Sequence, residues 1–156
     1  MAVETKWDLN DKTVEKLQTL IRYNLDSYDG FRECAEEVND RRLAQLFREL
    51  AEERMQNAEV LQTHVEWNGE DAREEGGMAA AVHRAWINIR SNVNSDNAYA
   101  VLAEAERGED YIKDAYEDVL KETSGSAMSD VLHQQYRGVK AGHDRIRDLR
   151  DSCKEE

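Results

Sequence analysis

Long stretches of the chain repeat apolar residues at steps of three and four, which is the spacing of one face of an α-helix. In the first stretch the row contains Val14, Leu17 and Ile21. It begins after Asn10 or Asp11, either of which can cap free backbone amides. The long helices predicted in this way cover residues 11–39, 41–67, 96–122 and 126–152. The sequence therefore predicts an all-α protein.

The connections between these helices differ in length. Short turns are predicted around residues 39–40 and 123–126, whereas the second helix stops at residues 68–69 and a polar loop follows it. A shorter amphipathic helix over 78–93 precedes the third long helix. One long connection between two helix pairs is typical of a ferritin-like antiparallel four-helix bundle. We expect residues 1–156 to form a single domain of this kind, with the short helix in the crossover; an irregular five-helix bundle is the alternative.

Polar side chains interrupt the apolar rows at similar depths. Counted from the same end of the bundle, all of them except Asn57 fall within about one and a half helical turns of one another. The interrupting side chains and their neighbours are Tyr28, Glu53, Asn57, Glu106, Glu109, Lys140 and His143. Carboxylates and an imidazole that are buried together must be paired or must bind a metal. This polar belt therefore predicts either a metal site or an ion network.

Carboxylate-bridged dimetal bundles place a Glu on each of two helices and a Glu-x-x-His on each of the other two. The ligands that this chain offers to iron, manganese or zinc are Glu53, Glu106, Glu109 and His143. The pattern is incomplete, because Gln56 stands where a His is needed and Lys140 where a Glu is needed. The first helix offers Asn24 and Tyr28 in place of an acid. We therefore favour a structural network in which Lys140, Asn57 and Tyr28 join these side chains without a cofactor. A metal site with fewer ligands is the alternative.

The composition supports long helices and limits the partners. The 156 residues include no proline and only 8 glycines, so long helices meet no obligatory break. A formal net charge of -13 repels nucleic-acid phosphates and anionic membrane surfaces. The first residues lack the apolar core of a signal peptide, and no stretch reaches the roughly 18 apolar residues of a membrane span. We expect a cytoplasmic protein with neither nucleic-acid nor membrane partners.

Sequence motifs for catalysis are absent. The chain has no Gly-x-Ser-x-Gly and no glycine-rich phosphate loop, and Cys34 and Cys153 form no CxxC. We expect both cysteines, and also His64 and His83, to be packing residues. The sequence therefore predicts no catalytic residue and favours a non-enzymatic protein.

Several short segments resemble those of an uncharacterised bacterial family of ferritin-like four-helix-bundle proteins, a domain of unknown function. The segments are Asp29 to Arg32, Ala51 to Arg54, His83 to Trp86, Glu104 to Asp110 and Val139 to Arg147. The resemblance covers nearly the whole chain and implies the bundle fold, with Lys140 beside His143 as part of the family pattern. It implies no established activity. A more distant similarity to ferritins and rubrerythrins implies iron storage or peroxide chemistry.

The function expected from these observations is that of a non-enzymatic bundle, acting in a stress response or as an interaction module. The alternative is a metal-binding or redox protein. An interaction module predicts an exposed apolar patch, around Trp7 or Trp86. Four-helix bundles often self-associate, so a homo-oligomer is a further expectation.

Overall fold

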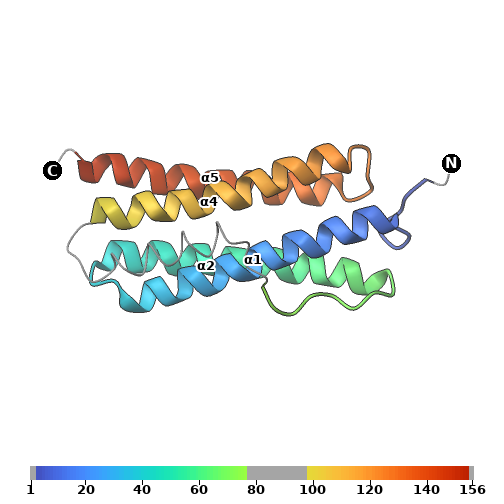
Figure 1. Cartoon of the computed structure of the whole chain (residues 1–156), viewed down its shortest axis with the longest axis horizontal. Coiled ribbons are helices and arrows are strands. Elements are labelled where there is room, and N and C mark those ends of the chain that lie inside the picture. The colour runs from blue at the N-terminus through green and yellow to red at the C-terminus, as the bar shows by residue number, and fades with distance from the viewer. Residues whose placement is uncertain (1–2, 77–97, 155–156) are drawn as a thin grey trace.

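The computed structural model describes residues 3–76 and 98–154, which form four long helices packed as a bundle (Figure 1). The helices are α1 (Asp11–Glu37), α2 (Arg41–Trp67), α4 (Ala98–Glu122) and α5 (Ser129–Lys154). The predicted all-α class is confirmed. The expected crossover helix over 78–93 lies outside the described residues. Within the described ranges, no helix has an apolar stretch long enough to cross a membrane.

Helix ends follow local hydrogen bonding, and those of the first and last helices differ from the predicted positions. The first helix stops at Glu37, because Val38 is extended with φ -75° and ψ 144°. The last helix begins at Ser129 instead of residue 126. Its predicted first residue, Ser126, belongs to the preceding turn, where its N–H donates to the Thr123 carbonyl at 2.9 Å. The apolar repeat predicts where the helices lie, but the positions of their ends depend on capping interactions.

Each short connection joins two antiparallel helices. Between α1 and α2, the Asp40 carboxylate accepts hydrogen bonds from the backbone N–H groups of Arg42 and Leu43 at 2.8 and 3.3 Å. These bonds satisfy two of the free amides at the start of α2. Between α4 and α5, Gly125 has φ 82°, a left-handed conformation that glycine adopts without a steric penalty.

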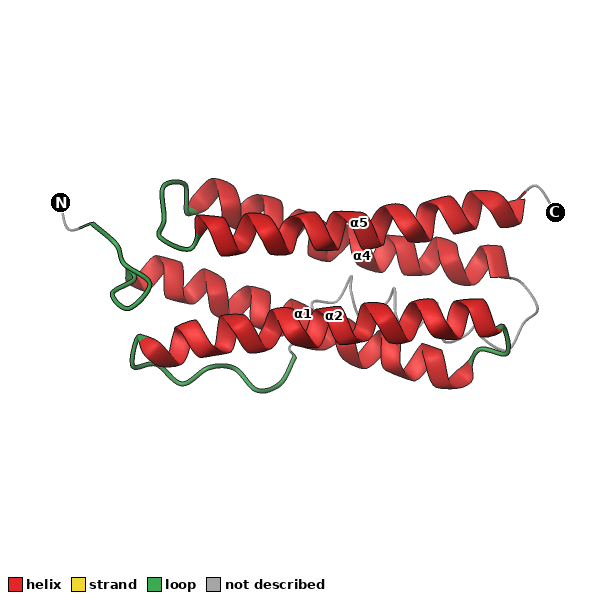
Figure 2. Ribbon diagram, turned by 180° about the vertical axis from the view of Figure 1, so that it is seen from behind, coloured by secondary structure: helices red, strands yellow, loops and turns green. Residues whose placement is uncertain are grey.

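The two helix pairs lie side by side, with α1 against α4 and α2 against α5 (Figures 1 and 2). Helices α2 and α4 run in the same direction and face each other across the centre (Figure 1). The chain that follows Trp67 therefore leaves α2 at the end of the bundle opposite the start of α4 at Ala98. Its first part lies against the α1–α2 pair, since the Gln18 and Gln62 side-chain amides donate to backbone carbonyls of this segment, each at 2.8 Å.

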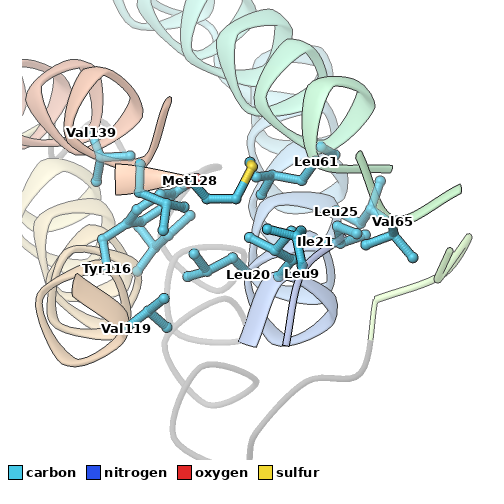
Figure 3. Packing of buried hydrophobic residues seen from close by; sticks show 14 residues of the cluster. Leu9, Leu20, Ile21, Leu25, Leu61, Val65, Tyr116, Val119, Met128 and Val139 are labelled. Carbon is cyan, nitrogen blue, oxygen red and sulfur yellow. The ribbon is translucent and has the colours of Figure 1, made fainter. Parts of the chain in front are cut away.

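Apolar side chains fill the centre of the bundle in two clusters. One cluster contains Phe31 and Phe47, whose stacked rings have centroids 5.6 Å apart. The other contains Leu61, Tyr116 and Met128, and Figure 3 shows Met128, which directly precedes α5, reaching toward Leu61 of α2. Arg54 on α2 and Glu109 on α4 lie between the two clusters along their helices.

The residues before α1 close one end of the bundle. The N–H of buried Leu9 donates to the Asn68 side chain at 2.8 Å, and Asn68 Nδ2 donates to the Lys6 carbonyl at 2.9 Å. The Glu4 carboxylate accepts a hydrogen bond from Ser126 Oγ at 2.6 Å. This segment thus ties the end of α2 to the turn between α4 and α5.

Candidate functional site

A fully buried ion pair crosses the middle of the bundle. Arg54 of α2 and Glu109 of α4 are both 0% exposed, and Arg54 Nη2 lies 2.5 Å from Glu109 Oε2. Because α2 and α4 face each other across the centre, the long Arg54 side chain spans the interior. Charges removed from water in this way are tolerated only when they are paired.

Arg54 is buried because it belongs to the apolar row of α2. Phe47, Ala51, Ala58 and Leu61 are buried at steps of three and four on either side of it. The sequence analysis placed Glu53 in this seam instead, and that position was wrong, since the Glu53 side chain is 48% exposed. When the average spacing of the residues assigned to one helix face is shorter than the helical repeat, the predicted face gradually shifts around the helix. It then includes residues beside those that are buried. The alanines and leucine that flank Arg54 are the sequence signal that could have identified it.

Gly142 of α5 provides the space for this ion pair. A Cβ atom at position 142 would lie 2.9 Å from Leu50 Cδ2, 3.0 Å from Arg54 Nη2 and 4.0 Å from Glu109 Oε2. Any larger residue would therefore press on the guanidinium. The glycine lets α5 cover the ion pair closely.

The ion pair leaves some hydrogen-bonding capacity unused. Within residues 3–76 and 98–154, no group makes a hydrogen bond with Arg54 Nε, Arg54 Nη1 or Glu109 Oε1. Glu53 Oε2 is 3.8 Å from Arg54 Nη1, beyond hydrogen-bonding distance. A groove of about 330 Å³ between α2 and α5 is lined in part by Arg54, Gln135 and Gly138.

A ring of hydrogen bonds links all four described helices beside the ion pair. Asn24 Nδ2 on α1 donates to the Tyr116 hydroxyl on α4 at 2.9 Å, and that hydroxyl donates to Gln135 Oε1 on α5 at 2.7 Å. Gln135 Nε2 donates to the Asn57 carbonyl on α2 at 3.3 Å. Asn57 Nδ2 closes the ring at Asn24 Oδ1, at 3.5 Å. The ring fixes the relative heights of the helices, because each bond requires its two partners to be level.

Burial raises the pKa of Tyr116 well above the ordinary value of tyrosine, and the hydrogen bond from Asn24 offsets this only in part. The ionised phenolate is disfavoured because it would lie in a region without solvent. Tyr116 therefore serves as a neutral hydrogen-bonding group.

Two residues of the predicted network lie elsewhere. Lys140 is exposed, and its predicted place in a cluster with Glu106 and Glu109 was wrong, because Val139 and Gly142 are the buried residues on that part of α5. Among the residues that the structure describes, Arg54 is the Lys or Arg buried in the interior. Tyr28 is half-buried and accepts a hydrogen bond from Arg32 at 3.2 Å, so it belongs to the edge of α1.

The predicted ligands Glu106 and His143 lie at the edge between α4 and α5, where Asp110 joins them. All three are half-buried. His143 Nε2 is 2.7 Å from Asp110 Oδ1, and His143 Nδ1 is 3.2 Å from Asp144 Oδ1. Sequence reasoning did not select Asp110, although its position four residues after Glu106 on a helix was a usable signal. The four proposed metal ligands are therefore divided between the surface, the bundle centre and this edge.

The chain was also compared with known proteins. Residues 12–122, which include α1, α2 and α4, match the family described as domain of unknown function (DUF2383). The chain belongs to this family. No curated protein sequence matches it. The DUF2383 match contains both residues of the buried ion pair, Arg54 and Glu109, whereas Gly142 and His143 of α5 lie beyond it.

Both cysteines and His64 of this DUF2383 bundle pack against apolar or aromatic side chains. Cys34 is buried, and Cys153 packs against the same apolar cluster, as the sequence analysis expected. Buried His64 lies edge-on to Trp67, with centroids 4.8 Å apart. Trp67 and Trp7 are 48% and 65% exposed and stack on each other at 5.3 Å. The other aromatic residue suggested for a surface patch, Trp86, lies outside the described residues.

Proposed function

We propose that this DUF2383 protein is a non-enzymatic, ferritin-like helical bundle whose buried polar groups hold the helices in register. The observation that carries the proposal is the Arg54–Glu109 ion pair at the centre of the bundle, with both side chains 0% exposed. The parallel course of α2 and α4, which requires a long crossover, supports the ferritin-like kinship.

The residues present do not fit the dimetal centre that a ferritin-like fold implies. Such a centre needs several carboxylates converging on two cations. Here Arg54 contacts Glu109, and its positively charged guanidinium would repel the metal ions. Asn24 and Tyr28 stand on α1 where another carboxylate would be required. No catalytic step through a metal pair is therefore part of this proposal.

A register-fixing role agrees with the energetics of buried ion pairs. Desolvation of the two charges opposes their attraction, so the pair adds little net stability compared with apolar residues of similar size. Misaligned helices would separate Arg54 from Glu109 and leave both charges buried and unpaired. The pair therefore acts mainly by making other arrangements unfavourable.

Arg54→Met and Glu109→Leu, made singly and together, test this role. Each single change is expected to lower the free energy of unfolding in urea by about 3–5 kcal/mol, because it leaves one buried charge unpaired. The double variant should recover most of that loss. Equal losses in all three variants would contradict a paired structural role.

The non-enzymatic part is tested separately, by measuring Fe(II)-dependent consumption of oxygen and hydrogen peroxide. Wild type and Glu109→Gln should both show only the rate of Fe(II) in buffer. Consumption well above that rate, abolished by Glu109→Gln, would overturn the proposal.

Whether the bundle acts in a stress response, as an interaction module or as a homo-oligomer stays a prediction. Sedimentation velocity tests self-association.

A further inference from the structure

A second group of charged side chains lies apart from the central ion pair, at the edge between α4 and α5. Glu106 and Asp110 are one turn apart on α4, and His143 reaches them from α5. One side-chain ligand atom from each residue lies within 4.8 Å of the other two. This geometry brings two carboxylates and an imidazole to one point.

We propose that Glu106, Asp110 and His143 bind a divalent cation of the zinc class. The proposal goes beyond the register-fixing role of the interior and does not depend on it. Zinc accepts mixed sets of imidazole nitrogen and carboxylate oxygen, and three protein ligands leave a fourth position for water. Ligand atoms around a tetrahedral zinc ion stand roughly 3.3–3.5 Å apart, as follows from metal–ligand distances near 2.0–2.1 Å. Small side-chain rotations would bring the three groups to that spacing.

Asp144 gives His143 the support that metal-bound histidines usually have. Its carboxylate lies 3.2 Å from His143 Nδ1, on the side of the ring opposite Asp110. A carboxylate that accepts the Nδ1 proton leaves the Nε2 lone pair for a metal ion. Asp144 is thus a positioning residue of the proposed site.

Glu106 has one oxygen engaged and one without a partner. Its Oε1 accepts a hydrogen bond from Arg150 at 2.7 Å. Its Oε2 is buried, and among the described residues no group donates a hydrogen bond to it. A cation would satisfy this oxygen, whereas Arg150 orients the carboxylate through the other one. The Arg150 charge opposes cation binding, and the carboxylates of Asp110 and Asp144 counter it.

The competing hypothesis is a metal-free ion cluster. Both nitrogens of His143 face carboxylate oxygens, so a protonated imidazolium could bridge Asp110 and Asp144. A metal ion would replace the Nε2 proton, and binding would release that proton to solvent. The two hypotheses therefore differ in whether Zn(II) binds at all.

Calorimetric titration of chelator-treated protein with Zn(II) tests the proposal, with Co(II) absorption as a report on coordination. Wild type should bind one equivalent, and Asp110→Asn and His143→Ala should each weaken binding by at least about tenfold. Asp144→Asn should weaken it by about tenfold without changing the Tm of the metal-free protein. Exposed residues on the same helices provide matched controls, and Asp114→Asn and His133→Ala should bind as wild type does.

Two results would overturn the site: no saturable Zn(II) binding by wild type, or unchanged binding in both Asp110→Asn and His143→Ala. The interior proposal is tested by Glu109→Gln, which should leave Zn(II) binding unchanged. Loss of binding in Glu109→Gln, with retention in Asp110→Asn, would instead place the metal in the bundle centre. Failure of the edge site and failure of the interior proposal are therefore distinguishable.

Discussion

Two glycines of α5 show how single residues control the packing of the interior. A Cβ at Gly142 would meet Leu50 and Arg54 at 2.9 and 3.0 Å, whereas a Cβ at Gly138 would have no neighbour within 4 Å. Both glycines weaken the helix to a similar extent, because they lose more backbone entropy than alanine does. Gly142 offsets that cost by allowing α5 to approach the buried ion pair.

We expect Gly138→Ala and Gly142→Ala to have opposite effects on stability. Gly138→Ala should raise the free energy of unfolding by about 0.5–1 kcal/mol, the usual gain in helix propensity. Gly142→Ala should lower it by about 1–3 kcal/mol, because the added methyl overpacks Leu50 and Arg54. Urea denaturation of the two variants measures the difference. Equal stabilisation by both would mean that α5 can move away from Arg54 without a penalty.

At the scale of elements, the hydrogen-bonded ring links each helix to its neighbours. Tyr116 is central to it, because its hydroxyl accepts from Asn24 and donates to Gln135. Apolar contacts tolerate small sliding of one helix along another, whereas these bonds do not. The hydrogen-bonded ring thus fixes the positions of the helices along their axes, which apolar packing alone would not do.

Tyr116→Phe is expected to lower stability by about 1–3 kcal/mol at neutral pH, because Gln135 Oε1 loses its donor. The raised pKa of Tyr116 predicts how this loss changes with pH. Above about pH 10, the ordinary pKa of tyrosine, the unfolded chain loses the proton while the folded protein keeps it. Wild-type stability should therefore fall relative to that of Tyr116→Phe as the pH rises.

Urea denaturation across this pH range measures how the difference in stability between wild type and Tyr116→Phe decreases. Tyr99→Phe is the matched control. Tyr99 is 38% exposed, so Tyr99→Phe removes a hydroxyl from the surface instead of from the hydrogen-bonded ring. A constant gap between wild type and Tyr116→Phe at high pH would show that the buried hydroxyl ionises as freely as one in solution.

At the scale of the whole molecule, charge is distributed unevenly between surface and interior. The chain carries 34 acidic and 21 Lys or Arg residues, a formal net charge of -13. One cation and one anion of the central pair are buried together, so this pair adds nothing to the net charge. Repulsion among the remaining acidic groups opposes the compact state.

We expect added NaCl to raise the Tm of the protein. Between about 0.01 and 1 M salt the screening length falls from about 30 to about 3 Å, which weakens repulsion between surface carboxylates. Surface ion pairs such as Arg145–Glu49 are weakened too, but exposed pairs contribute at most about 1 kcal/mol each. Calorimetry at several NaCl concentrations measures the shift. A falling Tm would mean that ion pairs outweigh the excess of negative charge.

The sequence by itself determined the helices and most of their buried faces. Steps of three and four predicted the rows of α4 and α5, in which Leu102, Glu109 and Tyr116, and Val139 and Ile146, are all buried. The sequence could predict these buried faces because helical periodicity depends only on residues that are close together in the chain. The shared depth of the polar side chains also followed from counting along antiparallel helices.

Only the tertiary structure decided which charges are paired. The alanines and leucine around Arg54 favour it over Glu53 as the interior residue, but they do not say which acidic group it meets there. The partnership of Arg54 with Glu109 joins residues 55 positions apart on helices that meet only across the bundle centre. A single step along a helix turns a side chain by about 100°, enough to move it from core to solvent. For this reason the sequence predicted a polar belt, and the fold decided which of its members lie in the centre.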